Sequence, residues 1–222
     1  MIHGMSPYHR TFPRAFLILM AGLFIHRLPL LAETKNTRGA EKTAHLELTV
    51  RVYGASIASP RTLGWAEKEA ARMLREVHLN LIWVNCRTPM PTQLCFSKES
   101  ETELTVRIVS KTLPGVSSRA LGVTSWPERP SGTGAAFIFY DRILAARTHS
   151  CILPVILGRT LAHEIMHLLL PAEPHTHSGL MRGQWNSQDL ERISAKRLGF
   201  SEDLIGLVHA SVLQRMLGAK VH

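Results

Sequence analysis

One segment of the 222-residue chain constrains the fold more than any other, the apolar stretch from Ile152 to Leu170. It is rich in Leu, Ile, Val and Ala, and Pro154 stands near its start, where a helix tolerates proline. Pro171 follows directly and would end a helix, because the residue before a proline is pushed out of the α region. Apart from Arg159 and one short polar motif, the segment is apolar on every side, which is typical of a helix buried in a core.

The polar motif on this helix reads His163-Glu164-x-x-His167. Positions four apart lie one turn above each other on an α-helix, so both imidazoles can face the same metal ion. Glu164 lies beside them, where its carboxylate can reach a water molecule on the ion without becoming a ligand. Without an ion, these buried polar groups would need other partners. The motif therefore predicts a catalytic metal site, with Zn²⁺ as the ion that suits imidazole ligands.

The loop after this helix supplies candidates for a third ligand. A catalytic zinc ion takes three protein ligands and keeps its fourth position for water. His175 and His177 both lie in this loop, and either imidazole could complete the site.

At this point the sequence resembles the metzincin metalloproteases, whose motif is His-Glu-x-x-His-x-x-Gly-x-x-His followed by a turn that contains methionine. Leu170 stands at the family's glycine position, and the third histidine comes later than in the family pattern. Ser178-Gly179-Leu180-Met181 looks like the Met-turn, which implies that Met181 is a hydrophobic floor and not a ligand.

The chain is also similar to short bacterial sequences in which Met-Arg-x-x-Trp follows the third histidine. Met181-Arg182-x-x-Trp185 matches that pattern, and the match assigns the third ligand to His175, with His177 as the alternative. The strong resemblance covers only the segment from the helix motif to this tryptophan.

The resemblance implies a zincin-like α/β (α+β) fold, in which a mixed twisted sheet packs on helices and a small helical subdomain forms the C-terminus. It also implies a metallopeptidase, more an endopeptidase than an exopeptidase, that acts on a peptide or protein. In such an enzyme Glu164 is the general base for a water molecule activated by zinc.

Two alternatives remain open from the sequence. In a gluzincin-like site, the third ligand would be an acid on the next helix, Glu191 or Asp189. A secreted, non-catalytic metal-binding or interaction domain could also use this scaffold. The presence of Glu164 speaks against the second alternative, because a structural site needs no base and favours a fourth protein ligand.

The N-terminus predicts export. Arg10 and Arg14 precede the apolar run Phe16 to Ile25, which is short for a membrane span of about 20 residues and fits a secretory leader. We expect residues 1–32 to be a signal peptide or a membrane anchor, 33–45 a polar linker, and 46–222 the zincin-like domain. The expected location is therefore secreted or in the cell envelope.

The formal charge of +9 does not indicate a nucleic-acid partner. Its Lys and Arg residues are scattered, and no basic block with interleaved aromatic residues is present. The sequence does not specify an oligomeric state.

The cysteines fit an oxidising compartment. Cys86 and Cys95 bracket a proline-containing loop, where we expect a disulfide. Cys151 would then remain, either as a buried free thiol or as a switch thiol next to the metal.

Apolar periodicity predicts the other elements. We expect strands at 46–52, 81–84, 103–109 and 135–140, and helices at 63–77, from 186 or 187 to 198, and at 201–217. Residues 53–61 read as a turn, and 113–133 as a long loop of the kind that often forms a binding segment or lid. The edge strand that pairs with substrate would be either 103–109 or 135–140.

Overall fold

The computed structural model describes residues 46–87, 91–97, 100, 102–126, 134–147, 153–170, 175–195, 197–201 and 203–218. All of them belong to one compact unit, Lys42–His222. The expected leader at 1–32, the linker at 33–45 and Cys151 lie outside these ranges.

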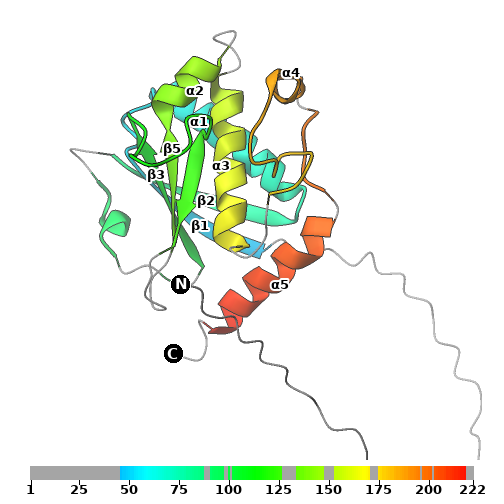
Figure 1. Cartoon of the computed structure of the whole chain (residues 1–222). Coiled ribbons are helices and arrows are strands. Elements are labelled where there is room, and N and C mark those ends of the chain that lie inside the picture. The colour runs from blue at the N-terminus through cyan, green and yellow to red at the C-terminus, as the bar shows by residue number, and fades with distance from the viewer. Residues whose placement is uncertain are drawn as a thin grey trace, which may run out of the picture. The chain divides into compact units, whose positions relative to one another are not determined.

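A five-stranded sheet in the order β2-β1-β3-β5-β4 forms one layer of this unit, and α1 (Pro60–Arg75) and α3 (Leu153–Leu169) lie beside it (Figure 1). Four neighbouring strands run parallel, and β4 alone runs antiparallel, to its neighbour β5. The strands are β1 (Leu46–Tyr53), β2 (Leu79–Cys86), β3 (Glu103–Val109), β4 (Gly122–Ser125) and β5 (Ala135–Phe139). The sheet confirms the expected mixed α/β class.

The helices are α1 (Pro60–Arg75), α2 (Tyr140–Ala146), α3 (Leu153–Leu169), α4 (Ser187–Ser194) and α5 (Asp203–Gly218), and a short 3₁₀ helix, η1, spans Gln93–Cys95. α1 and α3 pack against each other and against the sheet, and their shared apolar faces form the core. α3 is apolar all round and almost entirely buried, as its sequence predicts. None of the helices in the described ranges has the length and hydropathy that a membrane span requires.

α1 begins earlier than expected, inside the stretch that was read as a turn. The Ser59 hydroxyl accepts a hydrogen bond from the amide of Thr62 at 3.0 Å, which caps the helix. Pro60 occupies the first turn, where its missing N–H has no helical partner to lose. Serine followed by proline therefore starts the helix here, although the same two residues also suit a turn.

The expected loop at 113–133 contains a strand, and this strand changes the edge of the sheet. β4 lies in that stretch, beyond β5, so the two strands proposed as possible edges are both interior. That proposal was wrong: the edges are β2 and β4. Gly122-Val123-Thr124-Ser125 is only four residues long, and of these only Val123 and Thr124 favour strands, so pairing with β5 determines its conformation.

Two further boundaries differ from the expectation. Tyr140 begins α2 instead of ending the preceding strand, and no side chain caps this helix start to signal it. α4 ends at Ser194, several residues before the expected boundary. As a result, Leu198 and Gly199 belong to an irregular segment between α4 and α5.

Cys86 and Cys95, the pair expected to be bonded, have their sulfur atoms 2.08 Å apart, which is a disulfide. The bond joins the end of the edge strand β2 to η1. A disulfide of this kind is consistent with an exported protein.

Candidate metal centre

The motif histidines lie one turn apart on α3, as the spacing predicts. His163 is buried, with 7% of its surface exposed, and His167 is half-buried. His175 approaches from the irregular segment that follows the helix and is itself exposed.

The Nε2 atoms of these three histidines converge. His167 Nε2 lies 3.2 Å from His163 Nε2 and 3.1 Å from His175 Nε2. Two nitrogen ligands about 2.05 Å from a tetrahedral zinc ion would lie about 3.3 Å from each other. The spacing of the ring nitrogens therefore fits a shared tetrahedral ion.

Hydrogen bonds alone do not account for this arrangement. His163 Nδ1 lies 2.7 Å from the carbonyl oxygen of Leu180, which can only accept, so Nδ1 carries the proton and Nε2 presents a lone pair. His167 Nε2 faces two ring nitrogens at once, and a single N–H cannot point well at both. A cation between the three lone pairs satisfies all of them, which is the donor set of a His₃ zinc site.

Burial keeps the two helix imidazoles neutral, the form that binds a metal. It lowers the pKa of His163 to about 3, and the hydrogen bond to Leu180 only partly opposes this. Burial also lowers the pKa of His167 to about 4, and the nearby His175 adds to the effect.

The carbonyl of Leu180 orients His163. It accepts one hydrogen bond from His163 Nδ1 and a second, at 3.2 Å, from Trp185 Nε1. The Trp185 ring also stands edge-on to the His163 ring, with 5.9 Å between centroids. A second partner that fixes the tautomer and angle of a ligand histidine is a usual feature of metal sites.

The turn that carries Leu180 is the one expected to be a Met-turn. Gly179 adopts a φ of 79°, and a Cβ there would lie 3.0 Å from the carbonyl oxygen of Gly199, so glycine suits this position. Met181 is buried in the same turn and does not line the cavity described below.

Glu164 is held on the same helix by a residue of the edge strand. The Thr124 hydroxyl donates to Glu164 Oε2 at 2.8 Å, and Gly122 lies so close that a Cβ would be 2.9 Å from the Glu164 side chain. Burial raises the pKa of Glu164 to about 7, and the Thr124 hydrogen bond opposes the rise. A carboxyl of this pKa exchanges protons readily near neutral pH.

An open cavity of about 930 Å³ exposes this cluster. The three histidines, Glu164 and Trp185 contribute to its wall, together with the first three residues of β4 and most of the loop from Gly115 to Leu121. Arg142 Nη1 anchors that loop, because it donates to the carbonyls of Ser117 and Ala120.

The alternative ligands lie apart from the cluster. Among the described residues, His163, His167 and His175 form the one group of three or more that could hold a metal ion, and His177 is exposed outside it. Asp189 completes the capping box of α4 by accepting a hydrogen bond from the Asn186 amide, and it pairs with Arg182 at 2.8 Å. Glu191 is exposed on the same helix.

Sequence reasoning missed Thr124 as a partner of Glu164. The two residues are 40 positions apart, and Thr124 belongs to the strand that was read as loop. The matching pattern singles out Trp185, but its bond to Leu180 depends on the folded turn and is not encoded in that pattern.

No family model matches this chain, and no curated protein matches it either. Among solved structures, its fold is similar to that of a zinc-dependent peptidase from Methanocorpusculum labreanum (strain Z), with a TM-score of 0.46 and 11% identity. The likeness covers 72% of this chain and 99% of that chain. At this distance, the assignment of function rests on the residues of the cavity.

Proposed function

We propose that the protein is a zinc-dependent peptidase of the metzincin-like type, with its third histidine on the loop after the motif helix. The observation that supports this most is the convergence of three Nε2 atoms beside a buried carboxyl in an open cavity. A purely structural zinc site is closed by a fourth protein ligand, whereas this one pairs three ligands with a base.

His163, His167 and His175 would hold the ion, and His177, Glu191 and Asp189 would not. When bound, zinc acts as a Lewis acid that lowers the pKa of water and polarises a substrate carbonyl.

Glu164 would supply the proton transfers. Its carboxylate accepts a proton from the attacking water and then donates it to the leaving amine nitrogen. A pKa raised to about 7 by burial suits both steps at neutral pH, and the hydrogen bond from Thr124 holds the carboxyl in place.

The substrate would be an extended segment of a peptide or protein. β4 pairs with β5 on one side and, among the described strands, has no partner on its other side. A substrate strand can add to such an edge through main-chain hydrogen bonds, which do not depend on side chains. An open edge accepts the middle of a chain as well as its end, which favours an endopeptidase. The Cys86–Cys95 disulfide supports action outside the cytoplasm.

The test is metal analysis of the purified protein together with cleavage of a fluorogenic peptide library, with and without a chelator. We expect one zinc ion per chain and cleavage that chelation abolishes and added zinc restores. Glu164→Gln should keep the zinc and lose turnover by about 10²–10⁴-fold, because the base is gone while the ligands remain. A Glu164→Gln protein with normal turnover would contradict the role of Glu164.

Matched variants of the two loop histidines test the ligand set. We expect His175→Ala to lose tight zinc binding and activity, whereas His177→Ala keeps both. If the double variant His175→Ala/His177→Ala still binds one zinc ion tightly, the third ligand is a carboxylate such as that of Glu191. Zinc binding without cleavage of any peptide would favour a non-catalytic metal-binding domain.

A further inference from the structure

Arg159 is a buried charge in the motif helix that the proposed chemistry does not use. Its side chain is fully buried, it lies one turn before His163 on α3, and it does not line the cavity. A buried cation is costly unless every interaction it makes is favourable, so its partners indicate what it does.

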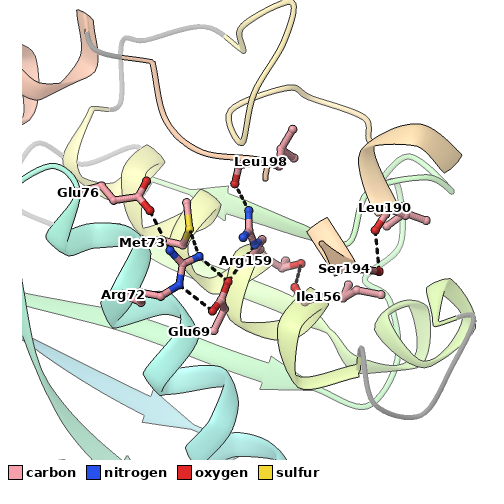
Figure 2. Close-up of polar contacts among 10 residues, drawn as sticks. Glu69, Arg72, Met73, Glu76, Ile156, Arg159, Leu190, Ser194 and Leu198 are labelled. Atoms are coloured by element: carbon pink, nitrogen blue, oxygen red, sulfur yellow. Dashed lines mark hydrogen bonds and ion pairs between the residues drawn. The ribbon is translucent and has the colours of Figure 1, made fainter. Parts of the chain in front are cut away.

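One partner is the carboxylate of Glu69 on α1 (Figure 2). Arg159 Nε donates to Glu69 Oε1 at 3.0 Å, and Arg72 donates to both oxygens of the same carboxylate, at 2.8 and 3.0 Å. Burial alone would raise the pKa of Glu69, but Arg72 and Arg159 together hold it below its ordinary value. Glu69 therefore stays charged and fixes the direction in which Arg159 points.

The other partner is the main-chain carbonyl of Leu198, to which Arg159 Nη1 donates. Residues 197–201 form neither helix nor strand, so individual contacts such as this one set the position of the segment. The next carbonyl, that of Gly199, accepts the amide hydrogen of Leu180 at 2.8 Å.

These bonds form a closed ring with the metal centre. From Arg159 the ring runs through the Leu198–Gly199 segment to Leu180, and the Leu180 carbonyl returns to α3 at His163. α3 thus holds the Leu180 turn directly through His163 and, one helical turn away, indirectly through Arg159 and the Leu198–Gly199 segment. A displacement of the Leu198–Gly199 segment would move the carbonyl that sets the angle of the His163 ring.

We propose that Arg159, held in place by Glu69, is a positioning residue for the metal centre: it fixes the Leu198–Gly199 segment and thereby the Leu180 carbonyl that orients His163. The inference rests on the proposed function only in that His163 binds a metal ion.

A purely structural role makes a different prediction. If the ion pair served only to join α1 to α3, an apolar pair of similar volume would replace it without loss, since buried ion pairs often exchange for apolar residues at no cost in stability. The bond to Leu198 is different, because only a hydrogen-bond donor can make it.

Arg159→Met removes the donor while Glu69 keeps its pairing with Arg72. Zinc affinity of the full chain would be measured by competition with a chromophoric chelator, alongside the visible spectrum of the Co²⁺-substituted protein and the melting temperature without metal. We expect zinc to bind about tenfold more weakly and the Co²⁺ spectrum to change. A tenfold loss of affinity is at the lower end of the range for residues that hydrogen-bond to metal ligands.

Arg51 and Glu103 provide the matched control, a second ion pair with a buried arginine, at 2.6 Å. Neither residue lines the cavity. Glu103→Gln should lower the melting temperature and leave both the zinc affinity and the Co²⁺ spectrum unchanged.

If Arg159→Met does not fold, the double variant Glu69→Gln/Arg159→Met provides the test instead. It removes both charges, and Arg72 retains Glu76 as a partner at 2.9 Å. The proposal expects restored folding with zinc affinity still weakened, and recovery of full affinity would overturn it. If the unaltered protein binds no zinc, both the proposed function and this inference are overturned. If the unaltered protein and Arg159→Met bind zinc with equal affinity, only this inference is overturned.

Discussion

Thr124 and Glu164 show how one hydroxyl group can tune the carboxyl that we propose as the base. Burial raises the pKa of the Glu164 carboxyl and the hydrogen bond from Thr124 lowers it, and burial has the larger effect. The carboxyl is therefore close to half-protonated at neutral pH in the metal-free protein, and its proton affinity responds to any change in its partner.

Thr124→Val should shift the pH dependence of cleavage. The lost hydrogen bond stabilised the charged carboxylate, so its removal raises the pKa of Glu164 and moves the acidic limb of kcat/KM to higher pH. A bond to a charged group contributes about 1.5–3 kcal/mol, so we expect a shift of about one pH unit or more. The measurement is a pH–rate profile, with Thr124→Ser as the control that keeps the hydroxyl. Identical profiles for all three proteins would exclude this role of Thr124.

At the same scale, the sequence identified only part of the site. His163, Glu164 and His167 follow from helical spacing, because the motif fixes their geometry locally. The choice between His175 and His177 needed a resemblance, since the path of a loop is not encoded in its spacing. Thr124 could not be found, because nothing near it in the sequence points to a carboxyl 40 positions away.

Among the elements, β4 links the sheet to the candidate metal centre. Its antiparallel pairing with β5 brings Gly122 against the side chain of Glu164 and Thr124 within hydrogen-bonding distance of it. The strand therefore fixes where the Glu164 carboxyl can lie.

Gly122→Ala should misplace the base without removing the metal. The added Cβ would lie 2.9 Å from Glu164 Cγ and from the Phe137 carbonyl oxygen, so a side chain or the strand must shift. A displacement of about 1 Å in a catalytic group can cost about 10²-fold in rate, and we expect a loss of that order in kcat with zinc content unchanged. Gly64→Ala on α1 is the control, because a Cβ there meets no atom within 4 Å. Full kcat in Gly122→Ala would show that the base tolerates this contact.

The elements that the sequence predicted are those with a strong local pattern. The apolar stripe of α1 and the all-round apolar surface of α3 each correspond to a helix in the structure. The sequence did not predict β4 or α2, and the reason differs for each element. The strand is too short and polar to signal itself, whereas the helix follows β5 with no turn between them.

At the scale of the whole molecule, the disulfide and the candidate metal centre lie at opposite edges of the sheet. Cys86 ends β2, and the strand order puts β2 and β4 at opposite edges. The bond can therefore affect stability without affecting the cavity.

Cys86→Ala/Cys95→Ala should lower the free energy of unfolding by about 2–3 kcal/mol, the loop-closure value for a bond between residues 9 positions apart. Urea unfolding of the full chain measures the loss. Cleavage per folded molecule should stay the same below the unfolding transition. Loss of cleavage by a folded double variant would show that the two ends of the sheet are coupled.

β4 also has a consequence for selectivity. The strand that would receive a peptide is the one whose threonine holds the proton acceptor. A chain that docks out of register would strain the strand and tilt the acceptor away from the attacking water. Poor substrates would then still bind in the cavity but be cleaved slowly, so selectivity would appear in kcat more than in KM.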